Sequence, residues 1–341
     1  MCTPAQLQVI TRPGTEETQT VAGALKRSVS RRDLLVGSLA FSVAPALSHF
    51  SAHADAIMAF TEIAPGIFVH QGRFELQSPL NRGDMSNTSF VVGTDAVAVI
   101  DTLCSAKLGS ELRAAIRAVT DKPVRYVINS HMHPDHVFGN VAFKNDDNVE
   151  FIGHHKLARG LSARADTYLA ANKMMLGDDA FAGTEIVLPT RGVDDKVTID
   201  LGGRQLTLEA QSVAHTDNDL IVSDSATGTL FLGDLLFSGH IPTLDGSLRG
   251  WLSLIDKLEH YKPTRVVPGH GPHAMQLPEA VGDEKRYWST VATDVRRMIK
   301  EGKTMNEATK TAGQSERGHW KLFDQYHVRN VTAAFAELEW E

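Results

Sequence analysis

Apolar positions along the chain follow two different periods after residue 60. Short runs rich in Val, Ile and Phe, such as Thr88–Val92, have the composition of buried strands. Between such runs, residues 108–120 carry apolar side chains at helical spacing. This alternation predicts an α/β fold. Further strands are expected at 67–70, 96–101, 124–129, 150–152, 185–188, 197–201, 206–210, 219–222, 228–233 and 265–267, and further helices at 155–173, 248–260, 279–301 and 329–338.

Two parts of the chain show the same order of features. In the first, a strand ends at Asp101, a helix follows, and a second strand leads to His131. In the second, a strand ends at Asp234, a helix follows, and a second strand leads to His270. We interpret this as a duplicated α/β unit, with chance similarity of amphipathic segments as the alternative. Duplication would bring the carboxyl ends of the matching strands to one edge.

The first 54 residues lack this pattern. Arg31 and Arg32 precede an uncharged, largely apolar segment at 34–47, and an Ala-x-Ala site ends at Ala54. These features predict an export signal of the twin-arginine type that is cleaved after Ala54, and hence a periplasmic protein. The alternatives are a short membrane anchor or a fortuitous arginine pair. The apolar segment is shorter than the roughly 20 residues that span a bilayer, so we expect no stable anchor after cleavage.

The predicted domains are therefore the signal, 1–54, and a single domain, 55–341, that ends in helices. The 341-residue chain is 42% hydrophobic and 22% charged, as is typical of globular proteins. Its formal net charge of −7 argues against a nucleic-acid partner. Only Cys2 and Cys104 are present, and cleavage would leave Cys104 alone, which excludes an internal disulfide. The unusual count is 15 histidines, because histidine is the commonest metal ligand.

Four potential metal ligands lie within six residues directly after a predicted strand. They are His131, His133, Asp135 and His136. Side chains two positions apart at a strand end point to one side, and a turn at Pro134 can direct the other two to a second point. A single zinc site does not need this crowding, whereas two metals about 3.5–4 Å apart do. The alternative interpretation is a histidine-rich surface loop.

Three further candidate ligands also lie at or after the ends of predicted strands. His215 follows the predicted strand at 206–210, and Asp234 ends the one at 228–233. A carboxylate at that position can bridge two metals. His270 lies between two glycines, which allow the backbone and the imidazole to approach a crowded centre.

This ordered set of motifs, over residues 62–275, resembles the metallo-β-lactamase superfamily. The resemblance implies a four-layer αββα sandwich that binds two Zn²⁺ per chain, with iron or manganese as other candidate metals. One metal would be held by His131, His133 and His215, the other by Asp135, His136 and His270, with Asp234 bridging the two. One departure is Leu103-Cys104, where the superfamily usually has glycine; it affects the expected loop conformation and not the ligands.

The segments at 233–240 and 245–251 resemble one exported branch, the quinoprotein relay system zinc metallohydrolases, which are related to a metallohydrolase of sulfur-oxidation systems. This resemblance implies association with a periplasmic quinoprotein or a sulfur-oxidation system. In this region His240 is a candidate for contact with substrate, and a structural turn is the alternative. Asp217 and Asn218 are candidates for supporting His215 from behind.

The ligand set predicts attack of a metal-activated hydroxide on a carbonyl or similar centre, and the family resemblance implies that the substrate is a small-molecule ester, thioester, lactone or related compound. Two Zn²⁺ with ionised Asp135 and Asp234 leave a net positive centre, which favours hydroxide at neutral pH and stabilises an oxyanion. Asp135 can also orient this nucleophile. β-Lactam hydrolysis is less expected, because superfamily members that open β-lactams usually carry Cys or Ser where this chain has Asp234.

Two other functions are compatible with the same motif. One is a mononuclear iron persulfide dioxygenase, and the other is a non-catalytic metal-binding accessory of a periplasmic redox or sulfur system. Elemental analysis distinguishes the hydrolase from the dioxygenase, because two zinc ions per chain favour hydrolysis and one iron favours sulfur oxidation.

Overall fold

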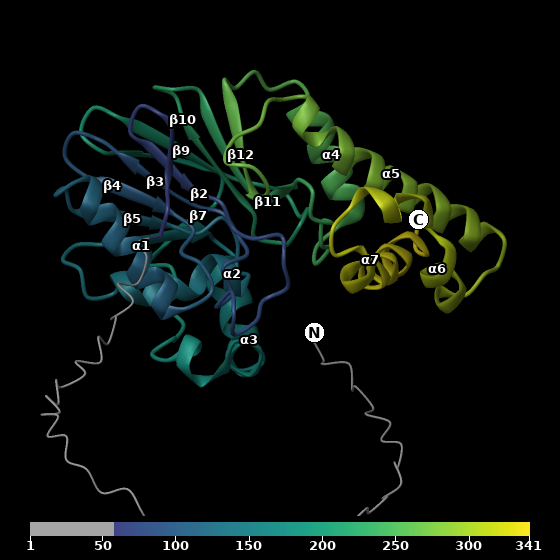
Figure 1. Ribbon diagram of the computed structural model, residues 1–341. Coiled ribbons are helices and arrows are strands. Elements are labelled where there is room, and N and C mark those ends of the chain that lie inside the picture. Colours follow the sequence, from purple (N-terminus) through teal and green to yellow (C-terminus); the bar gives the residue numbers. More distant parts are fainter. Residues whose placement is uncertain (1–57) are drawn as a thin grey trace, which may run out of the picture. The chain divides into compact units, whose positions relative to one another are not determined.

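Two β-sheets lie face to face between two layers of helices in the computed structural model (Figure 1). The structure describes residues 58–341, which fall into one compact unit. The predicted export signal at 1–54 lies outside the described residues. Within 58–341, no helix combines the length and apolar character needed to cross a membrane.

The first sheet has seven strands that follow one another in space as they do in sequence. Strands β1 to β4 pair antiparallel, and β4 to β7 pair parallel. They are β1 (Thr61–Ala64), β2 (Ile67–His70), β3 (Thr88–Val92), β4 (Val97–Ile100), β5 (Val124–Ile128), β6 (Glu150–His154) and β7 (Arg191–Val193). Its helical layer comprises α1 (Ala106–Val119), α2 (Pro134–Val137), the 3₁₀ helix η1 (Phe138–Phe143) and α3 (Leu157–Phe181).

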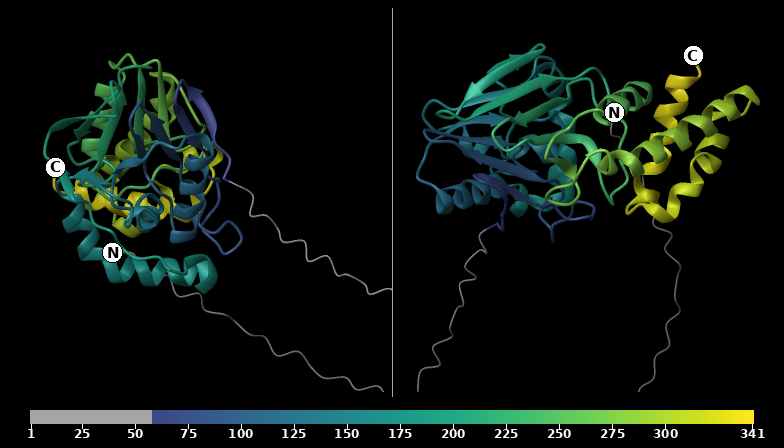
Figure 2. Two further views of the ribbon diagram at one scale, coloured as in Figure 1. Left: turned by 90° about the vertical axis from the view of Figure 1, so that its left-hand side faces the viewer. Right: turned by 90° about the horizontal axis from the view of Figure 1, so that it is seen from above.

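The second sheet has five strands in the spatial order β12-β11-β10-β9-β8, and only β11 and β12 among them pair parallel. They are β8 (Lys196–Asp200), β9 (Gln205–Ala210), β10 (Leu220–Asp224), β11 (Thr229–Phe237) and β12 (Arg265–His270). Its helices gather beyond β11 and β12 (Figure 2). They are α4 (Leu248–Leu258), α5 (Glu279–Lys300), α6 (Met305–Thr311), the 3₁₀ helix η2 (Gln314–His319) and α7 (Phe323–Leu338).

Three apolar cores hold these four layers together. Strand β4 shows the principle, because its side chains alternate between the two faces of the sheet. Val97 and Val99 pack toward α1 and α3, whereas Ala98 and Ile100 pack against the second sheet. The outer core of the second sheet is built around Trp251 of α4 together with side chains of α5 and α7. This αββα arrangement is the predicted fold class.

The repeated order of features in the sequence corresponds to two equivalent substructures. Strands β4 and β5 form a parallel pair joined through α1, and β11 and β12 form a parallel pair joined through α4. Asp101 directly follows the first strand of one unit, and Asp234 lies within the first strand of the other. His131 follows the second strand of its unit, and His270 ends the second strand of the other. The two units therefore deliver their polar residues to one edge.

The structure differs from the predicted elements at several places. Strand β1 was not predicted, and α3 ends at Phe181 instead of residue 173. Residues 185–188 form no strand, and Arg191–Val193 pairs with β6 instead; Pro189 between them lacks the N–H that a sheet ladder needs. The helix Met305–Thr311 was not predicted, although Thr304 and Glu307 form a capping box at its start. The last helix begins at Phe323, six residues before the predicted residue 329.

Candidate metal centre

Seven side chains meet where the two sheets present the ends of their strands. His131 and His133 follow β5, and the short helix α2 carries the next two ligand candidates. The turn before β10 supplies His215. Asp234 lies within β11, and His270 is the last residue of β12. All seven sequence-predicted ligands are therefore brought together: His131, His133, Asp135, His136, His215, Asp234 and His270.

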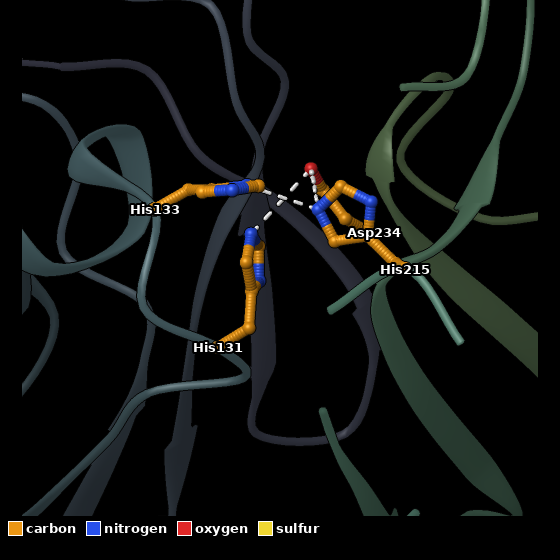
Figure 3. Close-up of side chains that lie close together, drawn as sticks. All are labelled: His131, His133, His215 and Asp234. Carbon is orange, nitrogen blue, oxygen red and sulfur yellow. Dashed lines mark hydrogen bonds and ion pairs between the residues drawn. The ribbon is translucent and has the colours of Figure 1, made fainter. Parts of the chain in front are cut away.

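The seven residues divide into two groups, in each of which the potential ligand atoms lie within 4.8 Å of one another. One group contains His131, His133, His215 and Asp234, whose side chains point to a common centre (Figure 3). The other contains Asp135, His136 and His270. The division matches the two sets implied by the family resemblance.

Asp234 lies between the two groups and turns one oxygen to each. Its Oδ2 is 3.4 Å from His215 Nε2 and 3.6 Å from His131 Nε2. Its Oδ1 is 3.2 Å from His136 Nε2 and 3.4 Å from His270 Nε2. A carboxylate in this position can contact two cations at once.

Each of the five histidines is held from behind by an oxygen atom that contacts its outer ring nitrogen. This contact fixes the orientation of the ring and the tautomer, and it leaves the other nitrogen facing the centre. The contacts are His131 Nδ1 to Ser130 Oγ (3.0 Å), His133 Nε2 to Asp245 Oδ2 (3.0 Å), His136 Nδ1 to Asp101 Oδ2 (2.8 Å), His215 Nδ1 to Thr243 O (2.7 Å) and His270 Nδ1 to Met85 O (2.8 Å).

Asp101 supports the second group from a strained turn after β4. Its φ angle is 60°, and that of Leu103 is 70°, both in the left-handed region that non-glycine residues rarely adopt. The Asp101 carboxylate accepts hydrogen bonds from Ser130 N and Oγ, both at 2.8 Å, in addition to its contact with His136. These bonds hold the turn in place and aim the carboxylate at the imidazole. The positive φ of Leu103 also explains why glycine is usual in this segment.

Asp245 is a functional residue that the sequence reasoning missed. It lies in the loop between β11 and α4, 112 positions beyond His133, whose Nε2 it contacts at 3.0 Å. Arg164 Nη1 donates to the same carboxylate oxygen at 2.7 Å, and Arg329 Nη2 lies 3.6 Å from the other oxygen. No local motif indicates these contacts, because they join the loop of Asp245 to three distant segments of the chain.

The electrostatics of the two groups differ. Burial lowers the pKa of His215 to about 3 and that of His131 well below its usual range, so both rings are neutral, as metal binding requires. Burial also disfavours the charged form of His270, but the charge of Asp234 and hydrogen bonds to Asp135 and Asp234 outweigh it and raise its pKa to about 9. A cation bound there would displace this proton.

The buried polar atoms fit a metal centre. Among the described residues, His131 Nε2, His136 Nε2 and Asp234 Oδ1 are buried and have no hydrogen-bond partner. Leaving such atoms unsatisfied costs about 1–3 kcal/mol each. All three atoms face the centre, and imidazole nitrogens with carboxylate oxygens are ligands that zinc prefers. The residues present therefore match the implied cofactor.

The structure does not place Asp217 or Asn218 against His215, as the sequence predicted, whereas His240 lies beside a ligand candidate. Asp217 contacts Asn218 Nδ2 at 2.8 Å and Arg159 Nη2 at 3.7 Å, whereas His215 is oriented by Thr243 O. His240 is buried, and its ring stacks on His270 with centroids 5.1 Å apart. Its Nδ1 donates to its neighbour's carbonyl at 2.6 Å, and its buried Nε2 has no partner among the described residues.

Comparison with known sequences agrees with this architecture. A sequence model of the metallo-beta-lactamase superfamily matches residues 81–270, which include all seven candidate ligands. The chain is also similar to a "Beta-lactamase-like protein 2 homolog" from Caenorhabditis elegans, with 23% identity over 252 residues, which are 73% of this chain and 75% of that protein.

Comparison with solved structures concerns the fold alone, because the identities are low. A beta-lactamase domain protein from Burkholderia ambifaria matches with a TM-score of 0.61 at 17% identity, over 86% of this chain and 90% of the other. A metallo-beta-lactamase from Pontibacter korlensis matches with a TM-score of 0.53 at 20% identity, over 68% and 98% of the two chains. Both support the assignment of the αββα sandwich.

Proposed function

Since the chain belongs to the metallo-beta-lactamase superfamily, whose members are mostly metal-dependent hydrolases, we propose that it is an exported zinc-dependent hydrolase. The substrate we propose is a small ester, thioester, lactone or related compound. The observation that carries this proposal is the position of Asp234, whose two oxygens face two separate groups of ligand atoms at 3.2–3.6 Å.

Two zinc ions, when bound, would supply Lewis-acid activation of water and positive charge opposite a developing oxyanion. The chain's own residues prepare this site. Ring orientation is fixed by the oxygen atoms behind each histidine, and Asp234 holds the two groups at a defined separation. The ligand residues are largely buried, so bulk water weakens the interactions of their charges less than it would at the surface.

Asp135 has a position suited to orienting a nucleophile. Its Oδ2 lies 3.3 Å from His270 Nε2 and 3.5 Å from His136 Nε2, so it reaches the second group with one oxygen. Its side chain is 14% exposed, more than that of any second-group histidine. One carboxylate can therefore serve as a ligand and, at the accessible edge of the centre, accept a hydrogen bond from an incoming water.

The test is a substrate panel of thioesters, lactones, sulfate esters and β-lactams on zinc-loaded protein. We expect turnover of a carbonyl ester, thioester or lactone that chelation abolishes and zinc restores. Asp234→Ala and His133→Ala should each abolish this turnover. Full metal-dependent activity in either variant would contradict the proposal.

Export and partnership belong to the same proposal. We propose that the chain is cleaved after Ala54 and works in the periplasm beside a quinoprotein or sulfur-oxidation system. N-terminal sequencing of the periplasmic protein should begin at Asp55, and replacing Arg31 and Arg32 by Lys should block export. Periplasmic protein from that variant at the normal level would contradict the twin-arginine route.

Crosslinking in whole cells followed by identification of the captured protein tests the proposed association with a quinoprotein or sulfur-oxidation system.

A further inference from the structure

The metal centre is accessible from one side. The side chains of His131, His136, His215, Asp234 and His270 are at most 4% exposed. His133 and Asp135 are 15% and 14% exposed. A substrate must therefore approach along the edge that these two residues form.

Two arginines from opposite layers of the fold stand at the His133 end of this edge. Arg164 comes from α3, which covers the first sheet, and Arg329 comes from α7, which covers the second. Both contact the carboxylate of Asp245, which in turn contacts His133. The guanidinium groups are thus separated from a candidate metal ligand by a single carboxylate.

Both guanidinium groups face the carboxylate of Asp245 directly. Arg164 Nη1 lies 2.7 Å from Asp245 Oδ2, and Arg329 Nη2 lies 3.6 Å from Asp245 Oδ1. One negative charge then faces two permanent positive charges. The arginines are also partly open to solvent, with 33% of the Arg164 side chain and 42% of the Arg329 side chain exposed.

Arg164 has donors that its protein contacts do not use. Within residues 58–341, its side-chain hydrogen bonds all involve Nη1, which contacts Asp245 Oδ2 at 2.7 Å, Tyr168 Oη at 3.3 Å and Met132 Sδ at 3.5 Å. Nη2 and Nε remain for a ligand. The planar guanidinium presents such donors in a fork that matches a carboxylate.

We propose that Arg164 and Arg329 bind a carboxylate of the substrate, so that the enzyme prefers esters that carry an ionised acid group away from the scissile carbonyl. This inference rests on the proposed hydrolase function and specifies its substrate class. Asp245 has two roles in it: its charge keeps the two arginines together, and its other contact orients His133. The two guanidinium charges would draw the acid group to the accessible edge.

A matched pair of chromogenic substrates tests the proposal. Mono-4-nitrophenyl glutarate and 4-nitrophenyl valerate have acyl chains of equal length, and only the first ends in a carboxylate. We expect zinc-loaded wild type to have the higher kcat/KM for the glutarate ester. Arg164→Gln should reduce this preference by about 10- to 100-fold, the effect of losing a hydrogen bond between charged groups. Arg164→Gln combined with Arg329→Gln should remove the preference entirely.

Arg159→Gln is the matched control. Arg159 lies on the same helix as Arg164, is 80% exposed and contacts Asp217 instead of Asp245. The preference should be unchanged in this variant. If Arg164→Gln lowers kcat/KM of both esters by the same factor, the arginine merely positions His133 and the proposal is wrong. Equal rates for the two esters in wild type would also overturn it.

A binding measurement separates this proposal from the hydrolase function. Calorimetry with glutarate on zinc-loaded protein needs no turnover. We expect binding to wild type and at least a tenfold weaker affinity in the double variant at unchanged zinc content. If neither ester is hydrolysed but this difference is found, the proposed hydrolysis of such esters fails and the carboxylate site stands. Equal glutarate affinity in wild type and the double variant, or no binding to either, refutes the site.

Discussion

Asp245→Asn tests how far the metal centre depends on a residue that is not itself a ligand candidate. The change preserves the shape of the side chain and removes the negative charge that His133 Nε2 contacts at 3.0 Å. The change also weakens the contact with Arg164 Nη1, which donates to Asp245 Oδ2 at 2.7 Å. If the amide nitrogen takes the place of Oδ2, its N–H groups face the N–H donors of Arg164 and His133 and cannot accept from them. Loss of an outer partner of a metal-binding histidine typically weakens metal affinity about 10- to 100-fold, or about 1.4–2.7 kcal/mol.

The assay is competition for zinc between the protein and a chromophoric chelator of known affinity. Asp217→Asn is the control, because Asp217 makes the same class of contact with an arginine and a neighbour but does not touch a candidate ligand. We expect a fall in zinc affinity in Asp245→Asn alone. An affinity within about twofold of wild type would refute the supporting role of Asp245. An equal fall in both variants would show that the effect is one of general charge.

Three further outcomes follow from the structure. Asp101→Asn should preferentially weaken the second group of ligands, since Asp101 Oδ2 contacts His136 Nδ1 at 2.8 Å, and elemental analysis after dialysis should show about one zinc retained per chain. Burial lowers the pKa of His70, but the hydrogen bond to Asp84, the charge of Asp84 and the contact with Ala59 O together outweigh this and raise the pKa above 6.5. The stabilisation from these contacts is complete below pH 6.5 and is lost as the pH rises through the raised pKa. The difference in Tm between wild type and His70→Gln should therefore shrink as the pH rises above 6.5, and a constant difference would contradict the pairing. Gly139→Ala places Cβ 1.8 Å from Thr102 O and should destabilise the protein by at least about 1–3 kcal/mol in urea unfolding, whereas Gly282→Ala in α5 meets no atom within 4 Å and should stabilise it by up to about 1 kcal/mol.

The local pattern of the sequence was sufficient for most of the fold and for the positions of the candidate ligands. Buried strands such as β3 and β12 are short apolar runs whose period and composition do not depend on distant contacts. The ligand candidates lie at or next to strand ends, and parallel strands bring such ends to one edge of a sheet. The motif around His131 therefore indicates both the residues and their place.

Other features depend on contacts that no local pattern contains. Asp245 supports His133 across 112 positions, and Asp101 supports His136 across 35. Strand β7 is fixed by pairing with β6, so the apolar residues at 185–188 were a misleading signal. These are tertiary effects, in which packing decides between segments of similar local propensity.

The metal content of the purified, zinc-reconstituted protein tests the central claim most directly. Inductively coupled plasma mass spectrometry should find two zinc ions per chain in wild type and fewer than two in Asp234→Ala, because Asp234 faces both groups of ligand atoms. Zinc-dependent hydrolysis should be lost with the second ion. A single iron per chain that zinc does not replace, or two zinc ions retained in Asp234→Ala, would contradict a binuclear zinc hydrolase.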